Sequence, residues 1–140
     1  MNLSRKLNAP KTFIYNKLIE SSIHDIKTST GVELTPEELK GYEYSKTFPS
    51  GHKATIHVVD IIENELYQFK TTTSIREFMT TYKIKELPNN RCEVICTETI
   101  ESHGPMLKYN DMLTGAVLGW SKRKQLKKIL DSMAATYNKE

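Results

Sequence analysis

Three polar residues stand at positions where the surrounding pattern predicts side chains that face the protein interior: Thr80, Glu98 and Arg123. Thr80 and Glu98 share their alternation with apolar residues of predicted β-strands, and Arg123 interrupts the apolar face of a predicted helix. Buried polar groups are costly unless they are hydrogen-bonded or ion-paired. We therefore expect a Glu98–Arg123 pair at the polar end of a pocket. The alternative is that Arg123 reaches solvent while Glu98 lies near an edge of the sheet.

The other residues predicted to line this pocket are mostly aromatic or apolar. They are Tyr44, Phe48, Phe78, Tyr82, Val94, Met112, Ala116 and Trp120, and Thr80 lines the predicted pocket with them. In a pocket of this kind, burial of apolar surface supplies affinity and one or two polar groups orient the ligand. The pattern therefore predicts the binding of a small hydrophobic or amphipathic molecule.

The residues that commonly perform nucleophilic or metal-assisted catalysis show no characteristic spacing. The four histidines are scattered: His24, His52, His57 and His103. The sequence contains neither HExxH nor a GxSxG elbow. We expect no metal, no cofactor and no dedicated catalytic group. If the pocket were catalytic, Glu98, Tyr82 and His57 would be the titratable candidates.

The two cysteines, Cys92 and Cys96, lie four residues apart in "RCEVICTE". On a strand this spacing places their Cα atoms about 13 Å apart, beyond the ~7 Å limit for a disulfide. No further cysteine or histidine lies at the spacing of zinc ligands. We expect two buried free thiols, which agrees with a cytoplasmic protein.

Near the C-terminus, an uncharged stretch (residues 112–120) precedes "SKRKQLKK", in which five of seven residues after Ser121 are basic. This cluster lacks the interleaved exposed aromatics of a single-strand nucleic-acid platform, so nucleic-acid binding is disfavoured. We interpret it as a solvated helix face that allows at most weak contact with an anionic membrane. The residues concerned are Lys122, Arg123, Lys124, Lys127 and Lys128.

The 140-residue chain has the size of one domain, and its 38% hydrophobic and 26% charged residues are typical of a soluble protein. The N-terminus has no apolar segment of a signal peptide, and no window reaches the ~18 apolar residues of a membrane-spanning helix. We expect a single domain over residues 1–140.

The elements that would position the pocket follow from periodicity and from helix-end signals. Residues 3–10 can form a first strand, and a helix over residues 11–31, capped by Asn8, ends at Gly31. Thr35, Pro36 and Glu38 form a capping box for one short helical turn. Five short strands follow to about residue 102 and are expected to pair as antiparallel neighbours. The sequence therefore predicts an α+β fold.

A long helix is predicted from Gly104-Pro105 to about Tyr137. One continuous stripe runs along it at alternating steps of four and three: Met112, Ala116, Gly119, Arg123, Leu126, Leu130, Met133 and Tyr137. Except for Arg123, the stripe is apolar, as expected for a helix that covers a sheet.

With this order of elements the chain resembles the START-like (SRPBCC, helix-grip) superfamily. More narrowly, it is similar to a family of small bacterial proteins that form a domain of unknown function. The matching stretches are "IHDIKTSTG", "GYEYSKTF", "CEV", "ESHG" and "NDMLTGAVLGWSKRKQLKK". The resemblance implies a curved antiparallel sheet of about six strands wrapped on the C-terminal helix. It also implies a hydrophobic cavity between them that often binds lipids, sterols or polyketide-like molecules.

Two alternatives to ligand binding remain open at the level of sequence. A cavity enzyme of the cyclase or hydrolase type would require titratable groups that converge in the pocket. A protein-interaction module would instead have a filled core and an exposed apolar patch.

Overall fold

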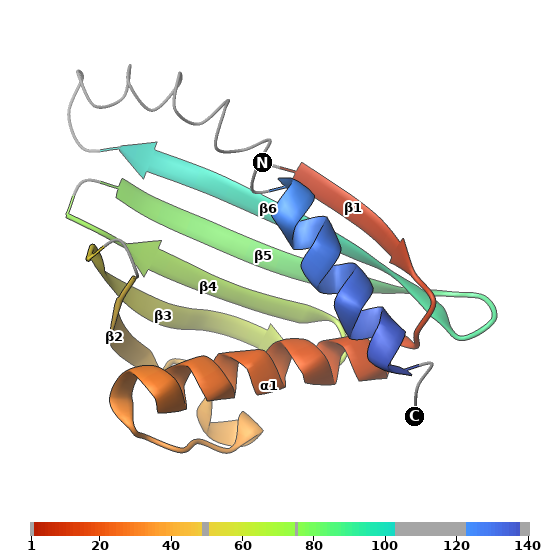
Figure 1. Cartoon of the computed structure of the whole chain (residues 1–140), viewed down its shortest axis with the longest axis horizontal. Coiled ribbons are helices and arrows are strands. Elements are labelled where there is room, and N and C mark those ends of the chain that lie inside the picture. The colour runs from red at the N-terminus through yellow and green to blue at the C-terminus, as the bar shows by residue number, and fades with distance from the viewer. Residues whose placement is uncertain (1, 49–50, 75, 103–122, 138–140) are drawn as a thin grey trace.

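The computed structural model of the chain describes residues 2–48, 51–74, 76–102 and 123–137. Its centre is one antiparallel sheet of six strands in the order β1-β6-β5-β4-β3-β2. The strands are β1 (Asn2–Leu7), β2 (Glu43–Thr47), β3 (Lys53–Ile62), β4 (Leu66–Thr72), β5 (Arg76–Leu87) and β6 (Arg91–Ser102). Strands β2 to β6 therefore lie in chain order, and β1 pairs with β6 at the far edge. This confirms the predicted curved antiparallel sheet (Figure 1).

Helix α1 (Lys11–Thr30) ends as the sequence predicts but begins differently. Gly31 closes it in the left-handed conformation with φ of 78°, and the Gly31 N–H donates to the carbonyl of Lys27. The predicted cap at Asn8 is wrong, because Pro10 occupies the N-cap position. The Asn8 side chain instead accepts a 2.9 Å hydrogen bond from Nε of Arg91, so its polar group is used between strands.

The short turn η1 (Pro36–Glu38) has the predicted capping box. Thr35 and Glu38 exchange side-chain and backbone hydrogen bonds, with the Thr35 N–H donating to the Glu38 carboxylate over 3.1 Å. Local sequence signals therefore place this turn correctly.

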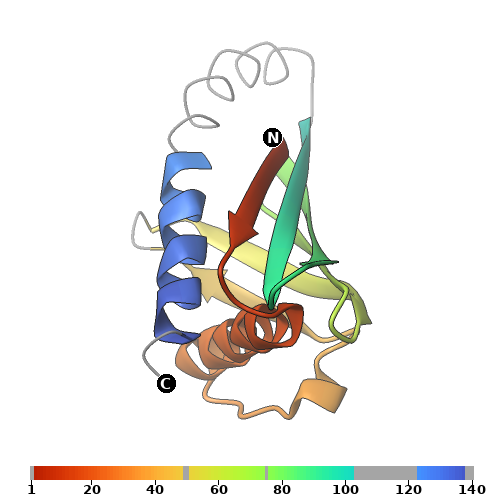
Figure 2. The ribbon, with the colours of Figure 1, turned by 90° about the vertical axis from the view of Figure 1, so that its right-hand side faces the viewer.

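A C-terminal helix covers residues 123–137 of the described chain; residues 105–122 of the predicted helix lie outside the described part. Leu130 and Ala134 are buried, and Leu126 and Met133 are half-buried, so the predicted apolar stripe faces the core here. The helix lies on the same side of the sheet as α1 (Figures 1 and 2).

Two contacts fix the C-terminal helix to other elements. The Arg5 guanidinium of β1 donates two hydrogen bonds, of 3.0 and 2.7 Å, to the Asp131 carboxylate. The ring of Tyr137 meets Phe13 of α1 edge-on, with centroids 5.0 Å apart. The sheet face against which both helices lie is therefore the covered face. The hydrophobic core lies against this face.

Candidate functional site

The register of β4, β5 and β6 builds the centre of the covered sheet face. Thr80 on β5 lies opposite Glu98 on β6 and opposite Phe69 on β4. The Thr80 hydroxyl donates a 3.2 Å hydrogen bond to the Glu98 carboxylate, and both residues are buried, at 5% and 7% exposure. The two polar residues that the sequence placed inside are thus partners of each other.

Next to this pair lies an aromatic cluster, which we define as Tyr67, Phe69 and Tyr82. Their ring centroids are 5.4 to 6.4 Å apart. Tyr67 and Tyr82 face each other across β4 and β5, with nearly parallel rings. Burial is the main cause that raises the pKa of the Tyr82 phenol well above its usual range. At neutral pH this group is therefore a hydrogen-bonding phenol rather than a base.

Sequence analysis named Tyr82 but missed Tyr67 and Phe69. The missed signal is the alternation in "LYQFKTT", where these two residues share one parity. Because β4 is a strand with one covered face, alternate residues of this segment must point toward the core.

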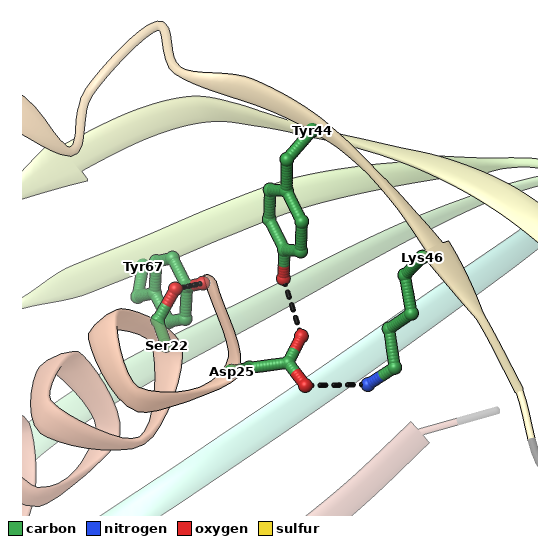
Figure 3. Close-up of polar contacts among 5 residues, drawn as sticks. All are labelled: Ser22, Asp25, Tyr44, Lys46 and Tyr67. Carbon is green, nitrogen blue, oxygen red and sulfur yellow. Dashed lines mark hydrogen bonds and ion pairs between the residues drawn. The ribbon is translucent and has the colours of Figure 1, made fainter. Parts of the chain in front are cut away.

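A second set of polar contacts joins α1 to the sheet. Tyr67 donates a 2.6 Å hydrogen bond to Ser22 of α1. One turn further along α1, the Asp25 carboxylate accepts hydrogen bonds of 2.6 Å from Tyr44 and 2.7 Å from Lys46 (Figure 3). Both β2 side chains point toward the same helix residue, so Asp25 ties the edge strand to α1.

The tyrosines of this group are protonated in the folded protein at neutral pH. Burial raises the pKa of Tyr67 to about 12, partly offset by its hydrogen bond to Ser22. Burial and then the adjacent Asp25 carboxylate raise the pKa of Tyr44 strongly. Ser22 could have been recognised from sequence, because it lies four residues after Leu18 and four before Ile26 on the buried face. Nothing in the sequence pairs Asp25 with β2.

The other predicted pocket residues differ in burial and in position. Val94 is fully buried on β6, Phe78 is half-buried on β5, and Tyr44 is buried but bound to α1. Phe48 lies just beyond β2, where Lys46 Nζ sits 5.2 Å from its ring centroid. It is therefore at the hairpin end and not beside the Thr80–Glu98 pair.

Arg123 opens the described part of the C-terminal helix, and its side chain is exposed. Glu98 is buried, whereas Arg123 is on the surface. The ion pair between them remains a prediction. Three further predicted residues, Met112, Ala116 and Trp120, lie outside the described residues.

The chemical candidates outside the pocket behave as ordinary structural residues. His24 is exposed, and His57 on β3 has the opposite parity to the buried Ile56 and Val58, so it does not face the aromatic cluster. Cys92 and Cys96 are buried and form no disulfide, as predicted. Among the described residues, no group of three or more His, Cys, Asp or Glu could hold a metal ion, and no helix is long and apolar enough to cross a membrane.

A curved antiparallel sheet closed by a C-terminal helix defines the START-like helix-grip fold. Solved structures share it across nearly their whole length. A conserved protein from Geobacillus kaustophilus is similar with a TM-score of 0.64 and 18% identity, over 96% of this chain and 95% of that chain. Truncated norcoclaurine synthase from Thalictrum flavum gives a TM-score of 0.61 and 13% identity, over 88% of each chain.

A point mutant of norcoclaurine synthase in complex with a transition state analogue is also similar. Its TM-score is 0.63, with 11% identity over 93% of this chain and 92% of that chain. At these identities the likeness concerns the fold alone. The chain belongs to the family described as a domain of unknown function (DUF3284), whose profile matches residues 1–119. A comparison with curated proteins gives no match.

Proposed function

We propose that this protein binds a small hydrophobic or amphipathic molecule between the covered face of the sheet and the C-terminal helix. The observation that carries the proposal is the buried Thr80–Glu98 hydrogen bond directly beside the aromatic cluster. An aromatic surface with one polar position at its edge is the composition expected of a small-molecule site.

Each part of this arrangement has a physical role in binding. The rings of Tyr67, Phe69 and Tyr82 would bury apolar or aromatic ligand surface, which supplies most of the affinity. The Glu98 carboxylate accepts a hydrogen bond from the Thr80 hydroxyl, and a carboxylate has about four acceptor positions in all. Its proposed role is to orient a hydroxyl or amine of the ligand.

The fold supports the same proposal at a coarser level. Norcoclaurine synthase, which shares the fold, has been solved with a transition state analogue bound. That complex supports a small-molecule role for this architecture, although low identity carries over neither the ligand nor the reaction.

An enzyme of the cyclase or hydrolase type remains the second candidate, with Glu98 and Tyr82 adjacent on the covered face. The geometry removes His57 from this candidate, because it lies on the opposite face of β3. We favour binding over catalysis, since the raised pKa of Tyr82 keeps its phenol protonated at neutral pH, where it cannot act as a general base.

A cytoplasmic location is part of the proposal, supported by two buried cysteines that form no disulfide. Weak contact with anionic membranes also remains a proposal. Arg123, Lys124, Lys127 and Lys128 are exposed on the C-terminal helix, and Lys122 lies outside the described residues.

Native mass spectrometry of the gently purified protein, beside a denatured sample of the same batch, tests the proposal. We expect extra mass in the native sample that is lost on denaturation and that belongs to an apolar or amphipathic compound. If the protein is recovered without a ligand and remains so after incubation with lipid and metabolite extracts, the binding proposal is wrong and a filled-core interaction module is favoured.

A pair of variants locates the binding. Glu98→Gln removes the charge of the buried acceptor, whereas Glu43→Gln makes the same change on an exposed position of β2. We expect the first variant to retain less ligand and the second to match the wild type. Circular dichroism of both variants controls for folding, and equal retention would place the ligand elsewhere.

A further inference from the structure

The two edges of the sheet differ in how they are protected. β1 forms one edge, and the C-terminal helix is tied to it by the contact between Arg5 and Asp131. β2 forms the other edge and pairs only with β3 (Figure 1). Within the described part of the chain, β2 is therefore the open edge.

The backbone hydrogen bonds of β2 show which of its groups face outward. The Val58 N–H donates to the Tyr42 carbonyl, and the Phe48 N–H donates to the His52 carbonyl. In an antiparallel ladder the hydrogen-bonded positions alternate along each strand. The even-numbered residues of β2 therefore bond to β3, and the odd-numbered residues direct their backbone N–H and C=O groups outward. These outward residues, all exposed, are Glu43, Ser45 and Thr47.

β2 lacks the features by which proteins commonly prevent the pairing of an edge strand. It contains no proline, and its pairing with β3 has no register shift. The inward-pointing charge of Lys46 is neutralised by Asp25, whose carboxylate lies 2.7 Å from the Lys46 Nζ (Figure 3). Such an edge is a template for an added strand.

We infer that β2 pairs with β2 of a second copy of this chain, antiparallel about a two-fold axis through Ser45. In this register Glu43 lies opposite Thr47 of the second copy, and Tyr44 lies opposite Lys46 of the second copy. The interface lies outside the aromatic cluster and the Thr80–Glu98 pair, so this inference is independent of the ligand proposed above.

The charges of β2 select this register among the symmetric ones. An axis through Glu43 or through Lys46 would place like charges directly opposite each other, which is destabilising. An axis through Tyr44 or through Thr47 would leave part of β2 without a partner in the other strand. Only the axis through Ser45 pairs all five residues of β2 and opposes no like charges.

The covered face of this junction is also complementary in charge. Asp25 accepts hydrogen bonds from Tyr44 and Lys46 of its own copy. Because Lys46 of the second copy lies opposite Tyr44, each Asp25 carboxylate gains a second ammonium nearby. A carboxylate has about four acceptor positions, enough for both ammonium groups and the phenol. This match favours a second copy over an unrelated extended peptide.

Sedimentation velocity of the full chain tests the inference. The interface is small, so we expect a monomer near about 1 µM and a growing share of dimer toward about 1 mM. Ser45→Pro removes an outward N–H at a position where an edge strand tolerates proline, and it should abolish the dimer. Circular dichroism controls for folding of this variant.

Charge variants of Thr47 test the register itself. Thr47→Lys places a cation opposite Glu43 and should tighten the dimer about threefold or more, whereas Thr47→Glu should weaken it by a similar factor. Thr99→Lys and Thr99→Glu are matched controls, because Thr99 is exposed on β6, away from the edge, and both should leave dimerisation unchanged.

Three results would overturn the inference. They are a monomer at every concentration, a dimer that survives in folded Ser45→Pro, and Thr47 variants that behave like the Thr99 controls. If Ser45→Pro does not fold, the Thr47 variants still decide, since they keep every backbone hydrogen-bonding group of β2.

Discussion

Tyr67 is buried on β4 and donates a 2.6 Å hydrogen bond to Ser22, a buried hydroxyl on α1. Tyr67→Phe keeps the ring in place but leaves the Ser22 oxygen without this partner. We expect the free energy of unfolding to fall by about 1–3 kcal/mol, the usual cost of an orphaned buried polar group. Urea denaturation measures the change.

Two further variants make that prediction specific. Ser22→Ala added to Tyr67→Phe should cost less than the sum of the two single changes, because the orphaned oxygen is gone. Tyr42→Phe serves as the control, since Tyr42 is half-buried and its hydroxyl makes no hydrogen bond among the described residues. A loss for Tyr42→Phe as large as that for Tyr67→Phe would argue against the hydrogen bond as the cause.

The buried thiol of Cys92 should make the free energy of unfolding depend on pH in the alkaline range. Burial raises the pKa of its thiol to about 11, whereas an unfolded cysteine titrates near about 8.5. Between these values the unfolded chain binds fewer protons than the folded one, so the free energy of unfolding falls as pH rises. The contribution of Cys92 to stability is complete below the pKa of its thiol in the unfolded chain. It is lost as pH rises through the pKa of the thiol in the folded protein.

We therefore expect Cys92→Ala to reduce the pH slope of stability between about pH 8 and about pH 10, by at most about 1.4 kcal/mol per pH unit. Val94→Ala is the matched control, because it removes a fully buried side chain of the same strand without a titrating group. Urea denaturation across this range compares the slopes. The prediction is contradicted if both variants keep the wild-type slope.

At the scale of elements, the C-terminal helix depends on its apolar stripe more than on its ion pair. Leu130 has 0% exposure, whereas its neighbour Ile129 is 47% exposed. We expect Leu130→Ala to lower the free energy of unfolding by about 2–5 kcal/mol and Ile129→Ala to stay within about 0.5 kcal/mol. Thermal and urea denaturation report both values, and similar losses would mean that the helix does not dock through this face.

The Arg5–Asp131 contact belongs to the same element. Both side chains are largely solvated, so Asp131→Asn should destabilise the protein much less than Leu130→Ala. Its effect should shrink further at high salt, because exposed charges are screened. An effect of Asp131→Asn that equals that of Leu130→Ala at high salt would contradict this ranking.

For the whole molecule, the strand order predicts a gradient of local stability. β6 lies between β1 and β5, and β5 lies between β4 and β6, whereas β2 is an edge strand paired only with β3. We expect backbone amides of β5 and β6 to exchange most slowly with deuterium and those of β2 and η1 to exchange faster. Mass spectrometry of exchanged peptides measures this, and equal protection of β2 and β6 would contradict it.

Much of the architecture was predictable because its signals are local or periodic. Gly31 ends α1 since it adopts a positive φ, and the Thr35–Glu38 capping box starts η1 within four residues. The alternation of apolar and polar residues along the strands predicts that Thr80, Tyr82, Val94 and Glu98 face the core, without any knowledge of which residues they contact. The predicted cap at Asn8 is wrong because Pro10 is the N-cap of α1, and the Asn8 side chain instead accepts from Arg91, which is distant in sequence.

The sequence by itself determined the order of elements, the antiparallel sheet and the residues that face its core, since period and turn chemistry act over a few residues. Only the tertiary structure decided which of those residues meet. The pairing of Ser22 with Tyr67, and of Asp25 with Tyr44 and Lys46, depends on where α1 crosses the sheet. That position is set by side-chain packing between segments far apart in the chain, which no local pattern encodes.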